Sequence, residues 1–284
     1  GFPYQTHFTG SYGDQLSLKT FEPTLRDPCV VSGPEFWGSF FAARRWPCVK
    51  ILPITTINLL QGLPMKYRSI TFDLDGTLLD TVYDLAEACR LMLEELSLPP
   101  RSETEIRHFV GRGMVVLVER CLTRETPPDE ALLHAAIESF KKHYAAVNGL
   151  KAQFFPGVRE GLAAWHATGL PLAVVTNKPA AFTETLIERI GIAQYFQVVV
   201  SGDTTEHRKP HPAPLLHACA VMGADPASNL HIGDSKHDIE TARNAGCDVF
   251  CVPYGYNEGE MVKAEDCDAL VADLSIALHL ARCA

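Results

Sequence analysis

The sequence predicts an open, Rossmann-like α/β fold, in which helices cover both faces of a parallel sheet and an α-helical cap is inserted after the first strand. Two observations favour this fold. In the second half of the chain, short apolar runs of strand length alternate with amphipathic segments of helix length, which is typical of a parallel sheet. Before that alternation, residues 82–153 show helical patterns only, so we expect them to form a separate insertion.

Hydrophobic periodicity predicts the first strand and the cap. Residues 69–74 form a short apolar run that ends in acidic residues and Gly76, as expected of a buried strand that leads into a loop. A helix is expected at 81–96, because its apolar residues share one face, and Pro99 and Pro100 end it. Three more helices are expected in the cap, at 102–110, 114–122 and 129–147.

The rest of the chain is predicted to alternate strands and helices. After a turn at Pro156-Gly157, a helix is expected at 158–168. Strands are expected at 172–176, 198–201, 230–233, 249–252 and 269–271. Helices are expected at 181–190, 213–222 and 236–245, each followed by a glycine, which commonly ends a helix. The core is therefore predicted at 65–80 and 154–284, and the cap at 81–153.

Residues 1–64 differ from this pattern. They contain no methionine, the first being Met65, and they show no sustained helical or strand period. They also lack the basic region and apolar stretch of a signal peptide. We expect this segment to be a non-native or disordered extension, and the native protein to begin at Met65.

Composition narrows the class of protein. The 284 residues are 46% hydrophobic and 21% charged, as in soluble globular proteins, and no apolar run reaches the roughly 20 residues of a membrane-spanning helix. The net charge of −9 disfavours nucleic acid as a partner, because surfaces that bind it are basic. The nine cysteines include no C-x-x-C pair, which predicts free thiols and a cytoplasmic location. We interpret His207, His211 and His217, which prolines separate, as ordinary histidines.

Two carboxylates lie at the end of the first predicted strand, in the sequence Asp73-Leu74-Asp75-Gly76-Thr77. Parallel sheets bind ligands at the carboxyl ends of their strands, where both side chains can turn toward one site. Adjacent carboxylates repel each other unless a cation neutralises them. Mg²⁺ is the obvious cation, because it prefers oxygen ligands and phosphate partners. The alternative is an acidic pair that only caps a helix.

Three later motifs also follow predicted strands. Thr176 and Asn177 offer donors for a phosphoryl oxygen, and Lys209 offers a compact positive charge in a proline-stiffened loop. Asp234 and Asp238 are four residues apart, on one face of the helix that begins there. Alone, each motif has an ordinary explanation, namely a polar loop, a solvated basic loop or a helix cap.

Together and in this order, the four motifs resemble those of the haloacid dehalogenase superfamily of phosphohydrolases. The resemblance covers nearly all of residues 68–252, and the helical insertion is similar to that superfamily's cap. Within it, the chain is most similar to the bacterial phosphoglycolate phosphatases, in Thr176-Asn177-Lys178-Pro179, Lys209-Pro210-His211-Pro212-Ala213-Pro214 and Gly233-Asp234-Ser235. The resemblance implies Mg²⁺ as cofactor and a small phosphorylated carboxylic acid, 2-phosphoglycolate, as substrate. We also expect a monomer or small homo-oligomer.

The resemblance further implies a role for each residue. Asp73 would be the nucleophile that attacks phosphorus, and Asp75 would protonate the leaving oxygen and then accept a proton from water. Mg²⁺ would bind the carboxylates of Asp73 and Asp234 and the backbone carbonyl of Asp75. The expected phosphoryl-binding residues are Thr176, Asn177 and Lys209. Asp238 would orient Lys209 or a metal-bound water.

Other activities remain open. Dehalogenases lack an acid at the position of Asp75, because a halide leaves without a proton, so phosphoryl transfer is expected. A sugar phosphomutase similar to β-phosphoglucomutase, a pyrophosphatase and a nucleotidase are the alternatives. A binding module that has lost catalysis is a further alternative, which the intact acids of the motifs argue against.

Arg112 is expected to bind the carboxylate of the substrate. It lies between Gly111 and Gly113, in a turn between two predicted helices of the cap, and a guanidinium suits a planar carboxylate. The backbone amides of this turn, or Lys178, could serve instead. The simplest alternative is a surface arginine in a glycine-rich turn.

Overall fold

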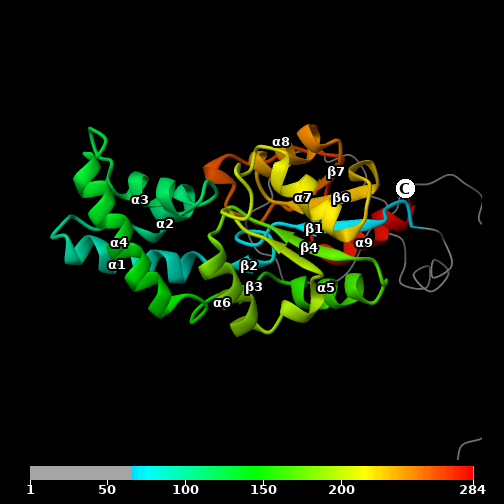
Figure 1. Cartoon of the computed structure of the whole chain (residues 1–284), viewed down its shortest axis with the longest axis horizontal. Coiled ribbons are helices and arrows are strands. Elements are labelled where there is room, and N and C mark those ends of the chain that lie inside the picture. Colours follow the sequence, from blue (N-terminus) through cyan, green and yellow to red (C-terminus); the bar gives the residue numbers. More distant parts are fainter. Residues whose placement is uncertain (1–64, 284) are drawn as a thin grey trace, which may run out of the picture. The chain divides into compact units, whose positions relative to one another are not determined.

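The computed structural model describes residues 65–283, and its core is a six-stranded parallel sheet (Figure 1). The strands lie in the order β5-β4-β1-β6-β7-β8, so the first strand of the chain is central. Their bounds are Ser69–Phe72 (β1), Leu172–Val175 (β4), Val198–Val200 (β5), Asn229–Gly233 (β6), Asp248–Cys251 (β7) and Ala269–Leu270 (β8). The predicted open α/β fold is confirmed. The expectations for residues 1–64 lie outside the described residues.

Side chains of the sheet alternate between two layers of helices. Ile70 and Phe72 of β1 belong to the large apolar core that includes residues of α5 and α9. Ala173 and Val175 of β4 point the other way, into a smaller cluster with α7. This alternation follows from the two-residue period of a strand. The flanking helices are α5 (Val158–His166), α6 (Ala180–Ile190), α7 (Ala213–Met222), α8 (Lys236–Ala245) and α9 (Leu274–Cys283).

The part predicted as the cap contains four helices, drawn cyan to green in Figure 1. Helices α1 and α4 pack along each other and bury Met92 and Phe140. The N-terminus of α2 is capped by Ser102, whose hydroxyl accepts from the N–H of Glu105 at 3.2 Å while the Glu105 carboxylate accepts from the N–H of Ser102 at 2.8 Å. The bounds are Val82–Glu95 (α1), Glu103–Phe109 (α2), Met114–Leu122 (α3) and Glu130–Val147 (α4).

Two short antiparallel strands mark where the chain passes between core and cap. They are β2 (Leu79–Asp80) and β3 (Gln153–Phe154). Next to them, the buried carboxylate of Asp84 accepts from three backbone N–H groups at 2.8–3.1 Å, those of Gly149, Lys151 and Ala152. The sequence did not predict this strand pair, because two residues are too few to show a period of two.

The other predicted elements lie within a few residues of their expected positions. Helices α3, α7 and α8 have the predicted bounds, and β1 is shorter than predicted because Asp73 and Leu74 already belong to the following loop. Helix α9 was not predicted. It completes the core, since the indole N–H of Trp165 in α5 donates to the carbonyl of Leu274 in α9 at 3.1 Å.

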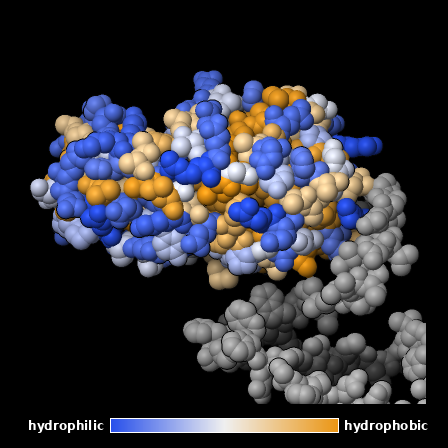
Figure 2. Space-filling model, turned by 90° about the horizontal axis from the view of Figure 1, so that it is seen from below, coloured by the Kyte–Doolittle hydropathy of each residue, from blue (hydrophilic) through white to orange (hydrophobic). Residues whose placement is uncertain are grey.

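The surface of the described residues is mixed in character. The face in Figure 2 is mostly hydrophilic, with apolar side chains interspersed. Within residues 65–283, no helix has both the length and the apolar character needed to span a membrane. The seven described cysteines are free thiols, and all but Cys283 are buried.

Candidate active site

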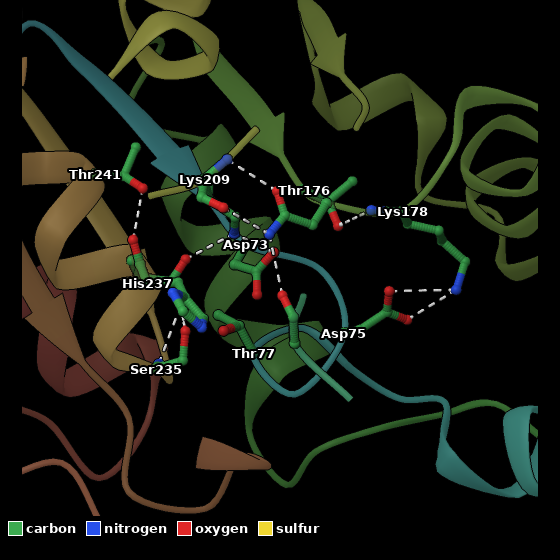
Figure 3. A network of polar contacts seen from close by, with 12 residues as sticks. Asp73, Asp75, Thr77, Thr176, Lys178, Lys209, Ser235, His237 and Thr241 are labelled. Carbon is green, nitrogen blue, oxygen red and sulfur yellow. Dashed lines mark hydrogen bonds and ion pairs between the residues drawn. The ribbon is translucent and has the colours of Figure 1, made fainter. Parts of the chain in front are cut away.

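The loops that follow β1, β4, β5 and β6 bring the four motifs to one edge of the sheet (Figure 3). Asp73 follows β1 directly, and its N–H still donates to the carbonyl of Ile232 in β6 at 2.9 Å. Thr176 follows β4, Lys209 lies in the loop after β5, and Asp234 follows β6. The parallel topology therefore gathers residues that are far apart in the chain.

Lys209 lies between two carboxylates. Its Nζ is 2.7 Å from Oδ1 of Asp73 and 2.7 Å from Oδ1 of Asp238. Asp238 is fixed in turn, because its Oδ2 accepts from the N–H and the hydroxyl of Ser235 at 3.0 and 2.7 Å. His231, from the buried strand β6, lies 3.2 Å from Oδ1 of Asp238 through Nε2. Asp238 thus holds the ammonium of Lys209 beside Asp73.

Three buried carboxylates, those of Asp73, Asp234 and Asp238, have oxygens within 4.8 Å of one another. Burial, together with the charge of Asp238, raises the pKa of Asp234 to about 7. Burial also raises the pKa of Asp73 above its ordinary value, although Lys209 opposes the shift. Burial acts on Asp238 in the same direction, but Lys209 and His231 lower its pKa below the usual range. With all three carboxyl groups ionised, the cluster would have more negative charge than Lys209 alone can balance.

Two glycines let the backbone approach Asp234 closely. Its Oδ1 accepts from the hydroxyl of Thr77 at 3.0 Å, and its Oδ2 from the N–H of Tyr256 at 2.7 Å. A Cβ at Gly76 would lie 2.6 Å from Oδ2, and the φ of +94° there also favours glycine. A Cβ at Gly255 would overlap the same carboxylate. Asp234 thus fits tightly between two loops.

The donor set of this cluster fits Mg²⁺. All its ligand atoms are carboxylate oxygens, which this ion prefers, and a cation would relieve the repulsion among them. The side chain of Asp75 is not part of the cluster. A contribution of Asp75 to the metal through its backbone carbonyl stays a prediction.

The carboxylate of Asp75 is turned away from Asp73, toward Lys178 (Figure 3). Nζ of Lys178 donates to Oδ1 and Oδ2 of Asp75 at 3.1 and 3.2 Å, and the hydroxyl of Thr81 donates to Oδ1 at 2.6 Å. The same ammonium donates to the hydroxyl of Tyr144, in α4 of the cap, at 2.6 Å. Asp75 is therefore held at the junction of core and cap.

The amide of Asn177 binds backbone groups, which the sequence did not predict. Its Oδ1 accepts from the N–H of Lys209 at 3.0 Å, and its Nδ2 donates to the carbonyls of Lys209 and Gly111, both at 3.1 Å. The amide thus fixes the loop of Lys209 and meets the cap, and binding of a phosphoryl oxygen by Asn177 stays a prediction. The hydroxyl of Thr176 accepts from the N–H of Lys178 at 3.2 Å and stays at the strand end as expected.

A cavity between cap and core opens beside these residues. Asp73, Asp75 and Thr176 line its core side. Lys178 is the cation among its lining residues, and Tyr144 adds a hydroxyl. The cap side is mostly apolar and includes Leu85, Val110, Met114, Leu117 and Phe140. A bound molecule would therefore contact Asp73 of the acidic cluster and Lys178 on the core side and an apolar wall on the cap side.

The structure does not bring Arg112 to the cavity, so its contact with a substrate carboxylate stays a prediction. Gly111 and Gly113 line the cavity, but Arg112 does not, and it is exposed. The backbone of this turn faces the core: a Cβ at Gly113 would lie 3.0 Å from the carbonyl oxygen of Asn177, and both glycines have positive φ. Because the backbone takes the inner side of the turn, the arginine side chain points outward. The basic group at the cavity is that of Lys178.

Sequence reasoning named Lys178 only as an alternative and did not name Tyr144. Lys178 follows Thr176 and Asn177 directly, so its position in the motif was the available signal. Tyr144 lies 34 residues before Lys178, in a helix predicted only from its period. Nothing in the sequence pairs these two residues.

Comparison with known proteins identifies the family. The family model described as "Haloacid dehalogenase-like hydrolase" matches residues 70–252. This chain belongs to the haloacid dehalogenase-like hydrolase family. The match spans all four motifs and the helices of the cap, so the family resemblance noted in the sequence is confirmed.

Curated members of this family are similar over most of their length. A phosphoglycolate phosphatase of Thiobacillus denitrificans (strain ATCC 25259 / T1) is 48% identical over 218 residues, which are 76% of this chain and 96% of that protein. That of Escherichia coli (strain K12) is 38% identical over 234 residues, with 75% and 93% covered. The crystal structure of a predicted phosphoglycolate phosphatase from Haemophilus somnus 129pt is 32% identical, with a TM-score of 0.71 over 76% of this chain and 98% of that one.

Proposed function

We propose that this chain is a Mg²⁺-dependent phosphatase that hydrolyses a small phosphomonoester, 2-phosphoglycolate, to glycolate and phosphate. The observation that carries the proposal is the position of Asp73, which shares Lys209 with Asp238, lies beside Asp234 and lines a cavity. This arrangement pairs a nucleophile with cationic charge for a phosphoryl group. The names of the curated relatives support the choice of substrate.

The proposed reaction has two displacements at phosphorus. An oxygen of Asp73 attacks phosphorus, the bond to the ester oxygen breaks, and Asp75, which enters this step as the neutral carboxylic acid, gives that oxygen its proton. Water then attacks the phosphorus of the aspartyl phosphate, Asp75 takes a proton from the water, and the carboxylate of Asp73 leaves. Lys209 faces Asp73 throughout and stabilises the negative charge that gathers on the phosphoryl oxygens.

Asp73 and Asp234, with the backbone carbonyl of Asp75, would hold Mg²⁺, which when bound supplies further positive charge to the phosphoryl oxygens. Asp238 keeps Lys209 in place, and Asn177 holds the backbone of Lys209 through two hydrogen bonds. Asp75 must first exchange its contact with Lys178 for one with the leaving oxygen.

Lys178 is the proposed partner of the substrate's carboxylate. It lines the cavity, and its ammonium is buried among the carboxylate of Asp75, the hydroxyl of Tyr144 and the ring face of the same tyrosine. Lys209 is paired with Asp73 and Asp238. Because it lies beside the proposed nucleophile, it would face the phosphoryl group of the substrate. A substrate with a second negative group can therefore place one charge at each lysine.

The seven free thiols among the described residues support the proposal of a reducing, cytoplasmic location.

A substrate screen tests the proposed function. Phosphate release by the full chain is measured with 2-phosphoglycolate, sugar phosphates, nucleotides, pyrophosphate and an aryl phosphate, each with Mg²⁺ and with a chelator. We expect the largest kcat/KM for 2-phosphoglycolate, loss of turnover with chelator, and no turnover by Asp73→Asn. A larger kcat/KM for a nucleotide or pyrophosphate would overturn the proposed choice of substrate. Isomerisation of a sugar phosphate without net release of phosphate would overturn it as well. Full activity of Asp73→Asn would overturn the mechanism.

A further inference from the structure

Glu258 forms a charged bridge between a helix of the cap and a helix of the core. Its Oε1 lies 2.7 Å from Nη1 of Arg120 in α3, and its Oε2 accepts from Nε2 of His237 in α8 at 2.9 Å. The side chain of Glu258 is only 10% exposed. Although burial favours the neutral carboxyl, Arg120 and His237 lower the pKa of Glu258. The mechanism above uses none of these three residues.

The backbone of Glu258 belongs to the loop that holds Asp234. Tyr256 and Asn257 direct their N–H groups to Oδ2 of Asp234, at 2.7 and 3.4 Å. Asn257 and Glu258, in the short helical turn η4 (Asn257–Gly259), have φ of +53° and +50°. A non-glycine residue adopts this left-handed conformation at a cost in free energy, so the surroundings must maintain it. The contacts of the Glu258 side chain are one such restraint on the loop.

On the cap side, the bridge reaches the turn that lines the cavity. Nη1 of Arg120 also donates to the carbonyl of Phe109 at 3.1 Å, at the end of α2. Gly111 follows two residues later, and a Cβ there would lie 3.3 Å from Cγ of Glu258. The carbonyl of Gly111 accepts from Asn177, which binds Lys209. Arg120 and Glu258 thus contact the cap turn that contains Gly111, which lines the cavity.

We infer that Glu258 is a positioning residue that couples the placement of the cap, through Arg120, to the loop whose amides hold Asp234. When the cap is in the position seen here, Arg120 completes the charge balance of Glu258 and stabilises the strained loop. When the cap moves away, Glu258 loses one of its two side-chain partners, and the amides on Asp234 become less restrained. The part of this inference that concerns Mg²⁺ rests on the proposed function, and the part that concerns the loop does not.

Hydrogen exchange of the metal-free full chain tests the coupling. The readout is the exchange rate of the amides of Tyr256 and Asn257. Arg120→Met keeps a long apolar stem and removes the charge, and Glu258→Gln keeps the shape of the side chain. We expect each variant to speed exchange at these amides by roughly twofold to thirtyfold, the range typical of residues that modulate coupling. In Glu258→Gln, adding Arg120→Met should have little further effect, because the partner is already neutral.

Arg124→Met is the matched control, since Arg124 lies in the same cap and donates to the carbonyls of Pro99 and Pro100 there. The proposal is overturned if Arg120→Met leaves exchange at Tyr256 and Asn257 unchanged, or if Arg124→Met changes it equally. It is also overturned if the effects of Arg120→Met and Glu258→Gln simply add.

Calorimetry with Mg²⁺ alone gives a second readout. Arg120 makes no proposed contact with the metal, yet Arg120→Met should weaken Mg²⁺ binding by roughly twofold to thirtyfold if the loop transmits the change to Asp234. Binding by Arg120→Met as tight as in the unaltered chain would overturn the coupling. If the unaltered chain binds no Mg²⁺, the proposed metal site is wrong, and the exchange experiment still decides whether the bridge restrains the loop.

Discussion

Nζ of Lys178 lies 3.1 and 3.2 Å from the two carboxylate oxygens of Asp75, although the residues are 103 positions apart in the chain. The side chain of Lys178 is 4% exposed, so this ion pair is largely shielded from water. A substrate carboxylate that binds Lys178 competes with Asp75 for the same ammonium. Substrate binding would thereby release Asp75 toward the leaving oxygen, and a molecule without the second charge would do so less well.

Lys178→Met is expected to lower kcat/KM for 2-phosphoglycolate. The loss should correspond to about 1.5–3 kcal/mol of transition-state stabilisation, the usual contribution of a hydrogen bond to a charged group. The loss for an aryl phosphate, which lacks the carboxylate, should be much smaller. Steady-state kinetics of both substrates measure this difference. A similar loss on both would mean that Lys178 acts only on Asp75 or on folding.

Arg112→Ala is the control for that experiment, because Arg112 is exposed and does not line the cavity. We expect little change in kcat/KM for either substrate. The change in transition-state stabilisation should be no more than about 0.5 kcal/mol, the size typical of surface substitutions. A loss of kcat/KM with 2-phosphoglycolate alone would instead show that Arg112 binds the carboxylate of the substrate, as expected from the sequence.

Asp75→Asn is expected to depend on the leaving group. General acid catalysis typically contributes about 10²–10⁴-fold, and an alkoxide needs the proton more than a phenolate does. The rate with 2-phosphoglycolate should therefore fall by that order, and the rate with a nitrophenyl phosphate by much less. Single-turnover measurements that separate formation of the aspartyl phosphate from its hydrolysis provide the check. Equal losses with both esters would argue against the acid role.

The positions of Asp73, Thr176 and Asp234 could be predicted from the sequence, because each follows a recognisable apolar run. In a parallel sheet, strand ends share an edge, so proximity in space follows from topology alone. Lys209 lies in a long loop, and its place at this edge was implied by the family resemblance. The fold class followed from the alternation of strand and helix, and the inserted cap from the stretch of helical patterns that precedes it.

The direction of individual side chains could not be predicted in this way. Asp75 turns toward Lys178, Asn177 binds the backbone of Lys209, and Arg112 points outward. These orientations depend on contacts with segments distant in sequence, such as Tyr144 in the cap, and on the backbone conformation of Gly111 and its neighbours. A period or a motif contains no information about such contacts.

Asp234→Asn is expected to raise thermal stability without Mg²⁺ and to abolish the response to Mg²⁺. Burial and Asp238 raise the pKa of Asp234 to about 7, so above this pH the folded chain holds an unfavourable charge there. The amide removes the charge, its oxygen can still accept from the N–H of Tyr256, and its NH2 can donate to the hydroxyl oxygen of Thr77. Thermal unfolding in chelator and in Mg²⁺, above pH 7, measures both effects. A variant that is less stable in chelator, or that Mg²⁺ still stabilises, would contradict this account.

Gly255→Ala tests how tightly the loop must approach Asp234. A Cβ at this position would overlap the carboxylate, so the loop must withdraw or Asp234 must rotate. Overpacking of this kind typically costs about 1–3 kcal/mol of stability, and we expect a loss of that size in the free energy of unfolding. The displaced loop would also carry the N–H of Tyr256 away from Oδ2, so Mg²⁺ binding should weaken beyond the loss of stability. Denaturant unfolding and calorimetry with Mg²⁺ measure the two effects separately. Unfolding and Mg²⁺ affinity both equal to those of the unaltered chain would show that the loop can yield, and that its close approach to Asp234 is not required.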